Sequence, residues 1–225
     1  MNGYEHAAHR IARPAAWSVA SLDCSLAERR AHALHLACEG MPIAIEPGEL
    51  IVGLRTLLPP TDQNGNIWQP LLPPFFRDDA EAESIDKGRS TSHNVPGFGK
   101  LIRHGLGELS SRAETRKAAE TDPVKREYLN SFTISCEAVG VLLARYAALA
   151  DKLAGETDDP LRRVELERIA GICQHLTTGT PRDLHEALQL YWSCWCLIVL
   201  EVGCLVSMGR LDQVLAPFWP SDPVE

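Results

Sequence analysis

A long helical pattern from Pro123 to Leu153 constrains the fold more than any other feature. Apolar residues recur along it at helical spacing on two faces. One face carries Val139, Leu143, Tyr146, Ala150 and Leu153, and the other carries Ile134, Ala138, Val141 and Leu142. A helix that is apolar on two sides must be covered on both, so we expect other helices to pack around it.

Helix start and stop residues predict several such neighbours. Ser25 and Glu28 fit a capping box, which predicts a helix from Leu26 to Cys38 that ends in a left-handed turn at Gly40. A second helix is predicted over 100–109, with weak points at two glycines, and residues 110–120 continue it as a charged stretch.

Two further helices are predicted after the long one. Asp159 and Pro160 are a good N-cap and first-turn pair for a helix with a narrow apolar stripe. The stripe consists of Leu166, Ile169, Cys173 and Leu176. Thr180 and Pro181 repeat the start pattern, which would place Asp183 in the first turn of the next helix.

Strands are expected only in short runs. Residues 42–45 and 49–54 favour extended structure and flank a Pro47-Gly48 turn. Residues 1–23 lack a sustained period and are interpreted as a loosely ordered lead-in. The long loop over 56–100 is of a kind that is usually functional or wraps another part of a larger protein. The fold class expected is therefore mainly α with a few β-strands.

The most apolar segment runs from Leu190 to Val206. It is shorter than the ~20 residues of a membrane span and contains Glu201. A membrane helix remains an alternative, but a core helix that leads into a strand explains the segment better.

Charge and cysteine content limit the partners and the compartment. The net charge of -8 argues against a nucleic-acid or acidic-membrane binder. Seven cysteines without a C-x2-C pair suggest packed thiols in a reducing, cytoplasmic compartment and give no metal site. No secretory leader is expected from the first 25 residues.

Three places could carry chemistry. His93 lies among hydroxyl and amide residues, where an imidazole could bond a substrate hydroxyl or act as an acid or base, or simply bond a backbone carbonyl. The polar segment from Ser207 to Gln213 would pair Arg210 with Asp212, in a turn whose role could be purely structural. Glu137 needs a partner if it faces inward, whereas a solvated Glu beside a core Cys explains it equally well.

Five segments, in this order, resemble the pyruvate formate-lyase-like domain of glycyl radical enzymes, especially the branch of diol, hydroxyproline and choline dehydratases and lyases. The matching segments are I-x-I-x-x-x-E-L-I-V-G at 43–53, H-x-x-P-x-F-x-K-L at 93–101, I-S-C-E-A at 134–138, P-R-x-x-H-E-A-L-Q at 181–189 and S-x-G-R-x-D-Q at 207–213. The resemblance implies that residues 24–225 form an N-terminal portion of the family's α/β barrel.

The same resemblance implies roles for some residues and cofactors for the intact enzyme. Substrate-binding roles carry over to His93 and Ser207, while Arg210, Asp212 and Glu137 form a structural polar motif. The family's thiyl Cys lies in a G-C-x-E loop and its glycyl radical in an R-V-x-G-[FY] loop, and neither pattern occurs in this sequence. No catalytic residue is therefore assigned to this chain, and no cofactor is expected to bind it.

We expect a fragment of a radical dehydratase, lyase or formate C-acyltransferase-like enzyme of anaerobic metabolism that is inactive alone. The intact enzyme would be a homodimer acting on a small polar substrate, with a radical installed by an S-adenosylmethionine and iron–sulfur activase. A complementary C-terminal chain is a further expected partner. The alternatives are a subunit of a split enzyme, a non-catalytic helical interaction module and, with less support, a membrane-associated helical protein.

Overall fold

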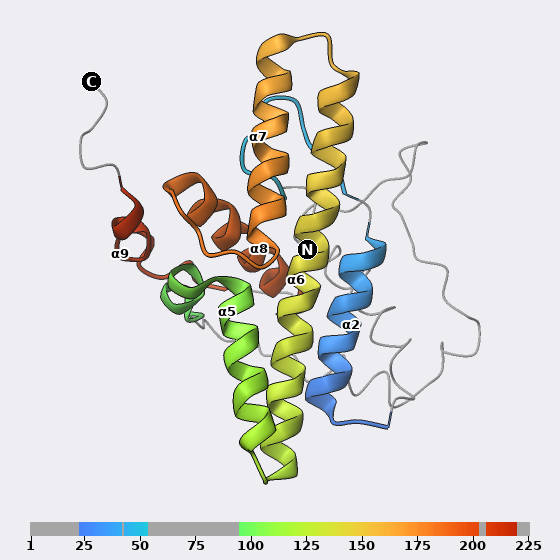
Figure 1. Cartoon of the computed structure of the whole chain (residues 1–225), viewed down its shortest axis with the longest axis vertical. Helices are drawn as coiled ribbons and strands as arrows, with labels where there is room; N and C mark the ends of the chain where they lie inside the picture. The colour runs from blue at the N-terminus through green and yellow to red at the C-terminus, as the bar shows by residue number, and fades with distance from the viewer. Residues whose placement is uncertain (1–22, 42, 54–94, 203–205, 220–225) are drawn as a thin grey trace, which may run out of the picture.

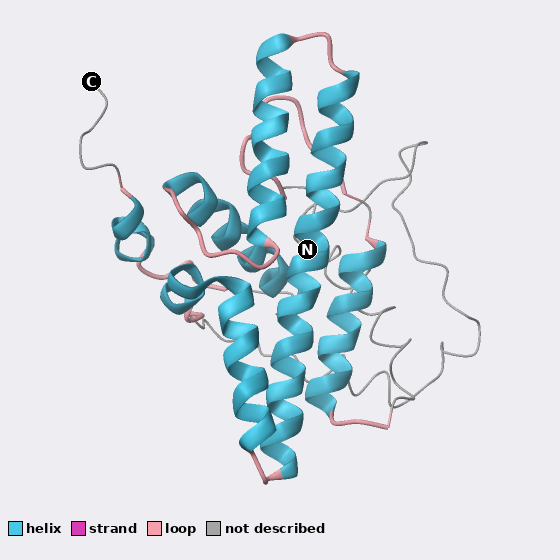
Figure 2. Ribbon diagram, in the orientation of Figure 1, coloured by secondary structure: helices cyan, strands magenta, loops and turns pink. Residues whose placement is uncertain are grey.

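The structure, a computed structural model, describes residues 23–41, 43–53, 95–202 and 206–219. Regular secondary structure within these ranges is helical (Figure 2). The elements are α2 Leu26–Gly40, α5 Phe98–Ala119, α6 Pro123–Glu156, α7 Pro160–Leu176, α8 Leu184–Val202, α9 Leu211–Leu215 and a 3-10 turn, η2 Ala216–Phe218. The mainly α part of the prediction is confirmed. The few strands stay a prediction, because these residues contain only an isolated bridge at Val206.

Helix α6 is the central element of the fold (Figure 1). Helices α2 and α5 run beside its first half, and α7 folds back along its second half. The predicted apolar faces explain this arrangement: Val139, Leu143, Tyr146 and Ala150 are buried on one side, and Ala138 and Leu142 on the other. The N-cap Asp122, whose carboxylate accepts the N–H groups of Val124 and Lys125, sets where α6 begins.

Helix α2 begins as predicted but ends differently. The Ser25 hydroxyl accepts the Glu28 N–H at 3.3 Å, and the last helical residue is Gly40. The left-handed turn predicted there is wrong, because the cap Met41 is extended at φ -64 and Gly40 has no positive φ. Arg145 of α6 donates to the Cys38 carbonyl at 2.5 Å and the Met41 carbonyl at 2.7 Å, so a side chain satisfies the helix end that a glycine turn would otherwise close.

Helix α5 is kinked at Gly105, one of the two predicted weak points. Gly105 adopts φ 70 and ψ 171, which strongly favours glycine. A Cβ there would lie 2.5 Å from the carbonyl oxygen of Gly179. The kink admits the loop between α7 and α8: Gly107 donates its N–H to the Thr178 carbonyl, and the Thr180 hydroxyl donates to the His104 carbonyl.

The start predicted for α8 is three residues too early. The helix begins at Leu184, and the Asp183 carboxylate accepts the Glu186 N–H at 2.9 Å as its cap. Thr180 does not cap because its hydroxyl is bonded to α5. Glu186 is 2% exposed and is held by the backbone N–H and guanidinium of Arg182, so its buried charge has a partner.

One helix in the described part of the chain, α6, has the length and composition of a membrane span. It is also the core helix that α2, α5 and α7 surround. Of the segment considered from the sequence, Leu190–Val206, residues 190–202 form the greater part of α8, whose Leu190, Cys194 and Leu197 are buried against the other helices. A core helix is therefore the interpretation that the packing supports for both segments.

Candidate functional site

Helix α8 gathers three segments that are distant in the sequence. The first is residues 43–53, where strands were expected. The described residues there form an extended segment around a turn at Pro47-Gly48 but no strand. The Gln189 amide takes the place of a neighbouring strand: its Oε1 accepts the Val52 N–H and its Nε2 donates to the Val52 carbonyl, both at 2.8 Å.

Charged and polar side chains hold the rest of this segment in place. The Glu49 carboxylate accepts the backbone N–H of Glu46 at 2.8 Å and that of Gly53 at 3.1 Å. Arg162 of α7 donates to the backbone carbonyl of Glu49, and the His185 ring is bonded to the backbone carbonyl of Leu50. The segment thus obtains its hydrogen bonds from side chains rather than from a ladder.

The second segment, 206–210, lies against the same helix. The Tyr191 hydroxyl donates to the Met208 carbonyl, and the Trp195 indole N–H donates to the Val206 carbonyl at 3.2 Å. Tyr191 and Trp195 are one turn apart, so a single face of α8 carries both donors. Burial raises the pKa of the Tyr191 phenol, which favours the protonated, donating form.

The third segment is the end of the loop that carries His93. His93 itself lies outside the described residues, but Val95, two positions later, contacts the 206–210 segment. Gly209 adopts φ 67, and a Cβ on it would lie 2.7 Å from Cγ1 of Val95. Phe98, the first residue of α5, packs its ring 4.3 Å from that of Tyr191. Residues 95–98, which follow His93, therefore meet the 206–210 segment beside Tyr191.

A surface pocket of about 330 Å³ lies beside this junction. Its lining is Glu49, Ile51, Leu188, Tyr191, Trp192, Met208 and Leu211. The lining is apolar apart from Glu49, whose carboxylate is occupied by backbone N–H groups. The pocket has the volume for a small molecule, and the polar groups beside it come from the loop that follows α8.

Ser207 and the polar pair occupy the exposed side of that loop. Ser207 is exposed, and its Oγ accepts the Gly209 N–H at 3.3 Å, which leaves its hydroxyl proton free to donate. Arg210 donates to both carboxylate oxygens of Asp212, at 3.1 and 2.9 Å. This hydrogen bonding raises the pKa of Arg210 and lowers that of Asp212.

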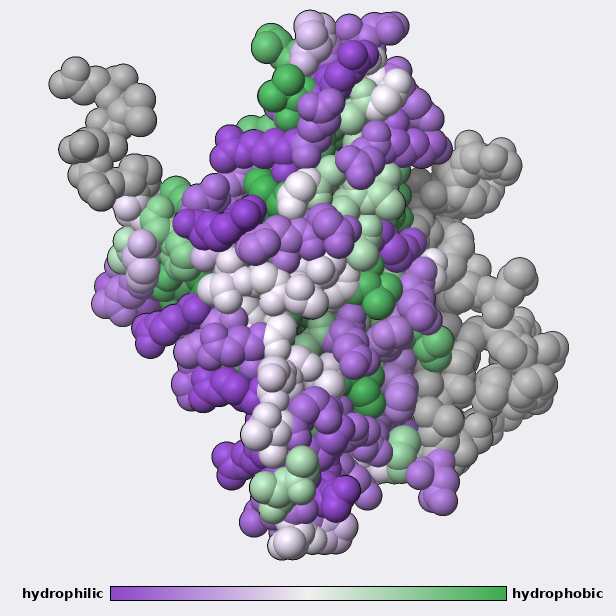
Figure 3. Space-filling view, viewed as in Figure 1, coloured by the Kyte–Doolittle hydropathy of each residue, from purple (hydrophilic) through white to green (hydrophobic). Residues whose placement is uncertain are grey.

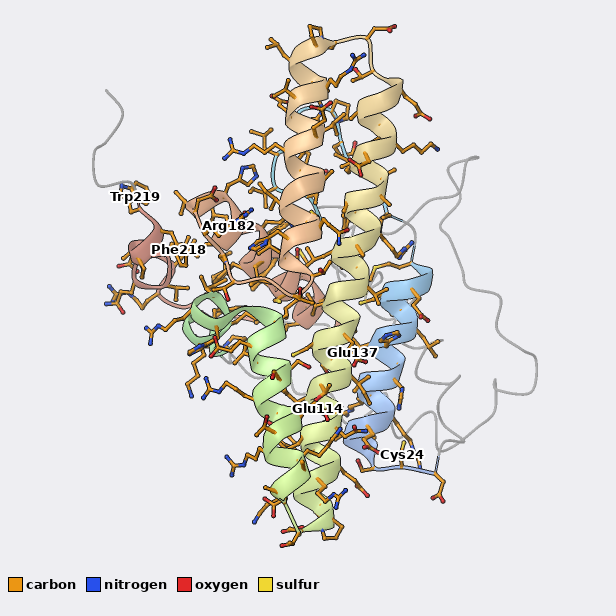
Figure 4. All side chains as sticks on the ribbon, viewed as in Figure 1. Cys24, Glu114, Glu137, Arg182, Phe218 and Trp219 are labelled. Carbon is orange, nitrogen blue, oxygen red and sulfur yellow. The ribbon has the colours of Figure 1, made fainter. Side chains whose placement is uncertain are left out.

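Glu137 stands apart from this site. It is exposed on α6 (Figure 4), and the next residue toward the N-terminus, Cys136, is buried. The described structure thus gives Glu137 the solvated position, and among the described residues no hydrogen bond or ion pair joins it to Ser207 or Arg210.

Five of the six described cysteines are buried among the helices, and Cys24, which precedes α2, is partly exposed. Cys38, Cys173 and Cys196 are 0 to 1% exposed, and all six described cysteines are free thiols. Burial raises the pKa of Cys38 and of Cys173 to about 12, so both stay protonated near neutral pH. No group of three metal-ligating side chains occurs among the described residues.

Comparison with known proteins assigns the family. The chain belongs to the pyruvate formate lyase-like family, whose model matches residues 77–225. The resemblance to the glycyl radical enzymes that the five motifs gave is confirmed.

Similar curated proteins include the isethionate sulfite-lyase of Nitratidesulfovibrio vulgaris, 34% identical over 146 residues, and the trans-4-hydroxy-L-proline dehydratase of Clostridioides difficile, 33% identical over 143 residues. These matches cover 61% and 60% of this chain and 18% of each relative. The chain thus matches a fragment of the relatives, under a fifth of their length.

Among solved structures, the B12-independent glycerol dehydratase of Clostridium butyricum has a TM-score of 0.75 at 24% identity. That superposition covers 96% of this chain and 34% of the dehydratase. The hydroxyproline dehydratase of Clostridioides difficile gives a TM-score of 0.73 at 22% identity, over 93% of this chain and 34% of the other. These likenesses establish the fold.

Sequence reasoning missed the residues that assemble the site. Gln189 and His185 lie in the P-R-x-x-H-E-A-L-Q segment, but the pattern does not say that they bond the backbone of residues 50 and 52. Tyr191 was counted only as part of an apolar run. The available signal was a glutamine and a tyrosine placed among apolar residues, since buried polar groups need partners.

Proposed function

We propose that this chain is an N-terminal fragment of a glycyl radical dehydratase or lyase that acts on a small polar substrate and is inactive alone. Its part in the enzyme is to supply the helical scaffold and two of the substrate-binding loops. In this proposal residues 24–225 are one partial domain of the family's α/β barrel, and the complete enzyme is a cytoplasmic homodimer of anaerobic metabolism.

The observation that carries the proposal is the contact of two distant segments, residues 95–98 and 206–210, beside Tyr191. The segment after His93 and the segment after Ser207 are separated by more than a hundred residues, yet Val95 contacts Gly209 beside an apolar pocket. Two hydroxyl-recognising side chains, an imidazole and a serine, would thus lie at one site. Such an arrangement suits a substrate with adjacent polar groups, as in the diols and hydroxyproline named for the related structures.

The chain's own side chains would bind and orient rather than start the reaction. Ser207 would donate its free hydroxyl proton to a polar group of the substrate. His93 would hold or protonate the leaving group. The radical, installed by an S-adenosylmethionine and iron–sulfur activase, would supply hydrogen-atom abstraction from the rest of the enzyme, because the G-C-x-E and R-V-x-G-[FY] patterns are not in this sequence.

The test is anaerobic reconstitution. The DNA downstream of codon 225 is sequenced, and a frame or co-encoded chain that carries both radical loops is produced together with this chain and an activase. We expect a glycyl radical signal by electron paramagnetic resonance and turnover of a diol, hydroxyproline or isethionate only when both parts are present. A stable chain with no such frame nearby would favour the interaction-module alternative.

Two variants then test the site. Ser207→Ala and His93→Ala should lower turnover at least about tenfold while leaving the radical signal intact, because binding groups act after radical formation. Ser111→Ala, on the exposed side of α5, is the matched control and should retain full turnover. Full activity in both site variants would refute the assigned binding roles.

A further inference from the structure

Tyr191 contacts both the 206–210 segment and the start of α5, and it is not among the predicted site residues. The residue is 1% exposed, although it contributes to the lining of the pocket beside the site. The phenol oxygen donates to the Met208 carbonyl, which is one residue from Ser207. Its ring packs on Phe98, five residues after His93.

We propose that Tyr191 is a positioning residue that fixes the Ser207 segment, residues 206–210, against residues 95–98 at the start of α5. The hydroxyl sets the height of the Ser207 loop above α8, and the ring sets the start of α5. The inference deepens the proposed function and rests on it for its catalytic meaning, whereas the contacts themselves belong to this chain alone.

The geometry distinguishes the two halves of the tyrosine. The ring fills space between α5 and α8, a role that phenylalanine would also perform. The hydroxyl makes one bond to a backbone carbonyl, and phenylalanine would leave that carbonyl without it. Trp195, one turn later, donates its indole N–H to the Val206 carbonyl, before the turn at Ser207–Gly209, so the bond from α8 to that turn comes from Tyr191.

Gly209 restricts where the 206–210 segment can lie. Its φ of 67 lets the loop turn back onto Val95, with room for no Cβ. Its N–H bonds the Ser207 hydroxyl oxygen, so a shift of the Met208 carbonyl would be passed to the Ser207 side chain through two adjacent residues. The amide of Gly209 is therefore a direct reporter of whether the loop is held.

The test is amide hydrogen exchange on the full chain with Tyr191→Phe. We expect the amides of residues 207–210 to exchange about tenfold faster, since one lost hydrogen bond shifts local opening by about that factor. Amides in the middle of α6 should keep their protection. The matched control is Tyr146→Phe, which removes another buried phenol, on α6, and should leave residues 207–210 unchanged.

Two results would overturn the proposal. Unchanged exchange at 207–210 would show that the hydroxyl does not hold the loop, and an equal rise in α6 would show that Tyr191 only supports overall stability. In the reconstituted enzyme, Tyr191→Phe should raise KM for the substrate more than it lowers kcat. If that enzyme shows no activity even with Tyr191 intact, the proposed function fails, while the exchange result still decides the role of Tyr191.

Discussion

Replacing Gln189 by leucine should cost a large part of the stability of the fold. Gln189 is 1% exposed and Val52, which it bonds, is 0% exposed. Leucine has a similar volume, so packing is nearly conserved. The change therefore removes hydrogen bonds in a buried place and adds little strain.

The magnitude follows from the groups left without partners. The Gln189 amide satisfies the N–H and the carbonyl of Val52 at 2.8 Å each and bonds the Ser193 hydroxyl at 2.9 Å. Each buried backbone group left unsatisfied costs about 1–3 kcal/mol. After the apolar gain of leucine is subtracted, the free energy of unfolding should fall by about 2–4 kcal/mol, against a total of roughly 5–15 kcal/mol for a domain.

Urea unfolding followed by far-ultraviolet circular dichroism measures this change. With a slope of about 2 kcal/mol per molar urea, the midpoint should fall by about 1–2 M. The matched control is Gln174→Leu, an exposed glutamine on α7, which should change stability by less than about 0.5 kcal/mol. A Gln189→Leu midpoint equal to that of the control would refute the idea that Gln189 substitutes for a strand.

Three further outcomes are expected. Gly105→Ala should lower Tm by roughly 6–12 °C, because it combines a backbone conformation that strongly favours glycine with a steric clash. The control Gly155→Ala in α6, where a Cβ would have nothing within 4 Å, should raise Tm slightly. Arg145→Met should lower the free energy of unfolding by about 1–3 kcal/mol in chemical denaturation, because two carbonyls at the end of α2 lose their donors. Burial raises the pKa of Cys38 from 9.0 to about 12 in the folded chain, so the thiol loses its proton first in the unfolded chain, and the free energy of unfolding should fall as pH rises from 9 to 12. Because Cys38 is buried and Cys24 is partly exposed, iodoacetamide at pH 8 should modify Cys24 well before Cys38.

The helices could be predicted from the sequence because their signals are local. The long pattern of α6 and the Asp159-Pro160 start of α7 each depend on residues within one or two turns, and both are confirmed. The error at Gly40 and the early start of α8 have one cause. In each case a residue of another helix is the partner: Arg145 of α6 donates to the end of α2, and the His104 carbonyl of α5 accepts the Thr180 hydroxyl.

The candidate site was harder to predict because its contacts cross the sequence. The motif resemblance predicts substrate-binding roles for His93 and Ser207, but no local pattern pairs Gln189 with Val52 or Tyr191 with Met208. Such partners are chosen by the way the helices pack. The face shown in Figure 3 is mostly hydrophilic, with apolar residues in small scattered groups, and it gives no sign of these buried bonds.

The bond between Gln189 and Val52 also sets an order for folding during synthesis. Helices α5, α6 and α7 follow one another and can pack as soon as each leaves the ribosome, whereas Val52 must wait for a residue 137 positions later. At 5–20 residues per second that wait is roughly 7 to 27 s. For that time the segment from Ile43 to Gly53 lacks Gln189, so the N–H and carbonyl of Val52 have not yet met their partner. A bound chaperone or the speed of translation through α8 would then affect how much of the newly made chain reaches the packed state.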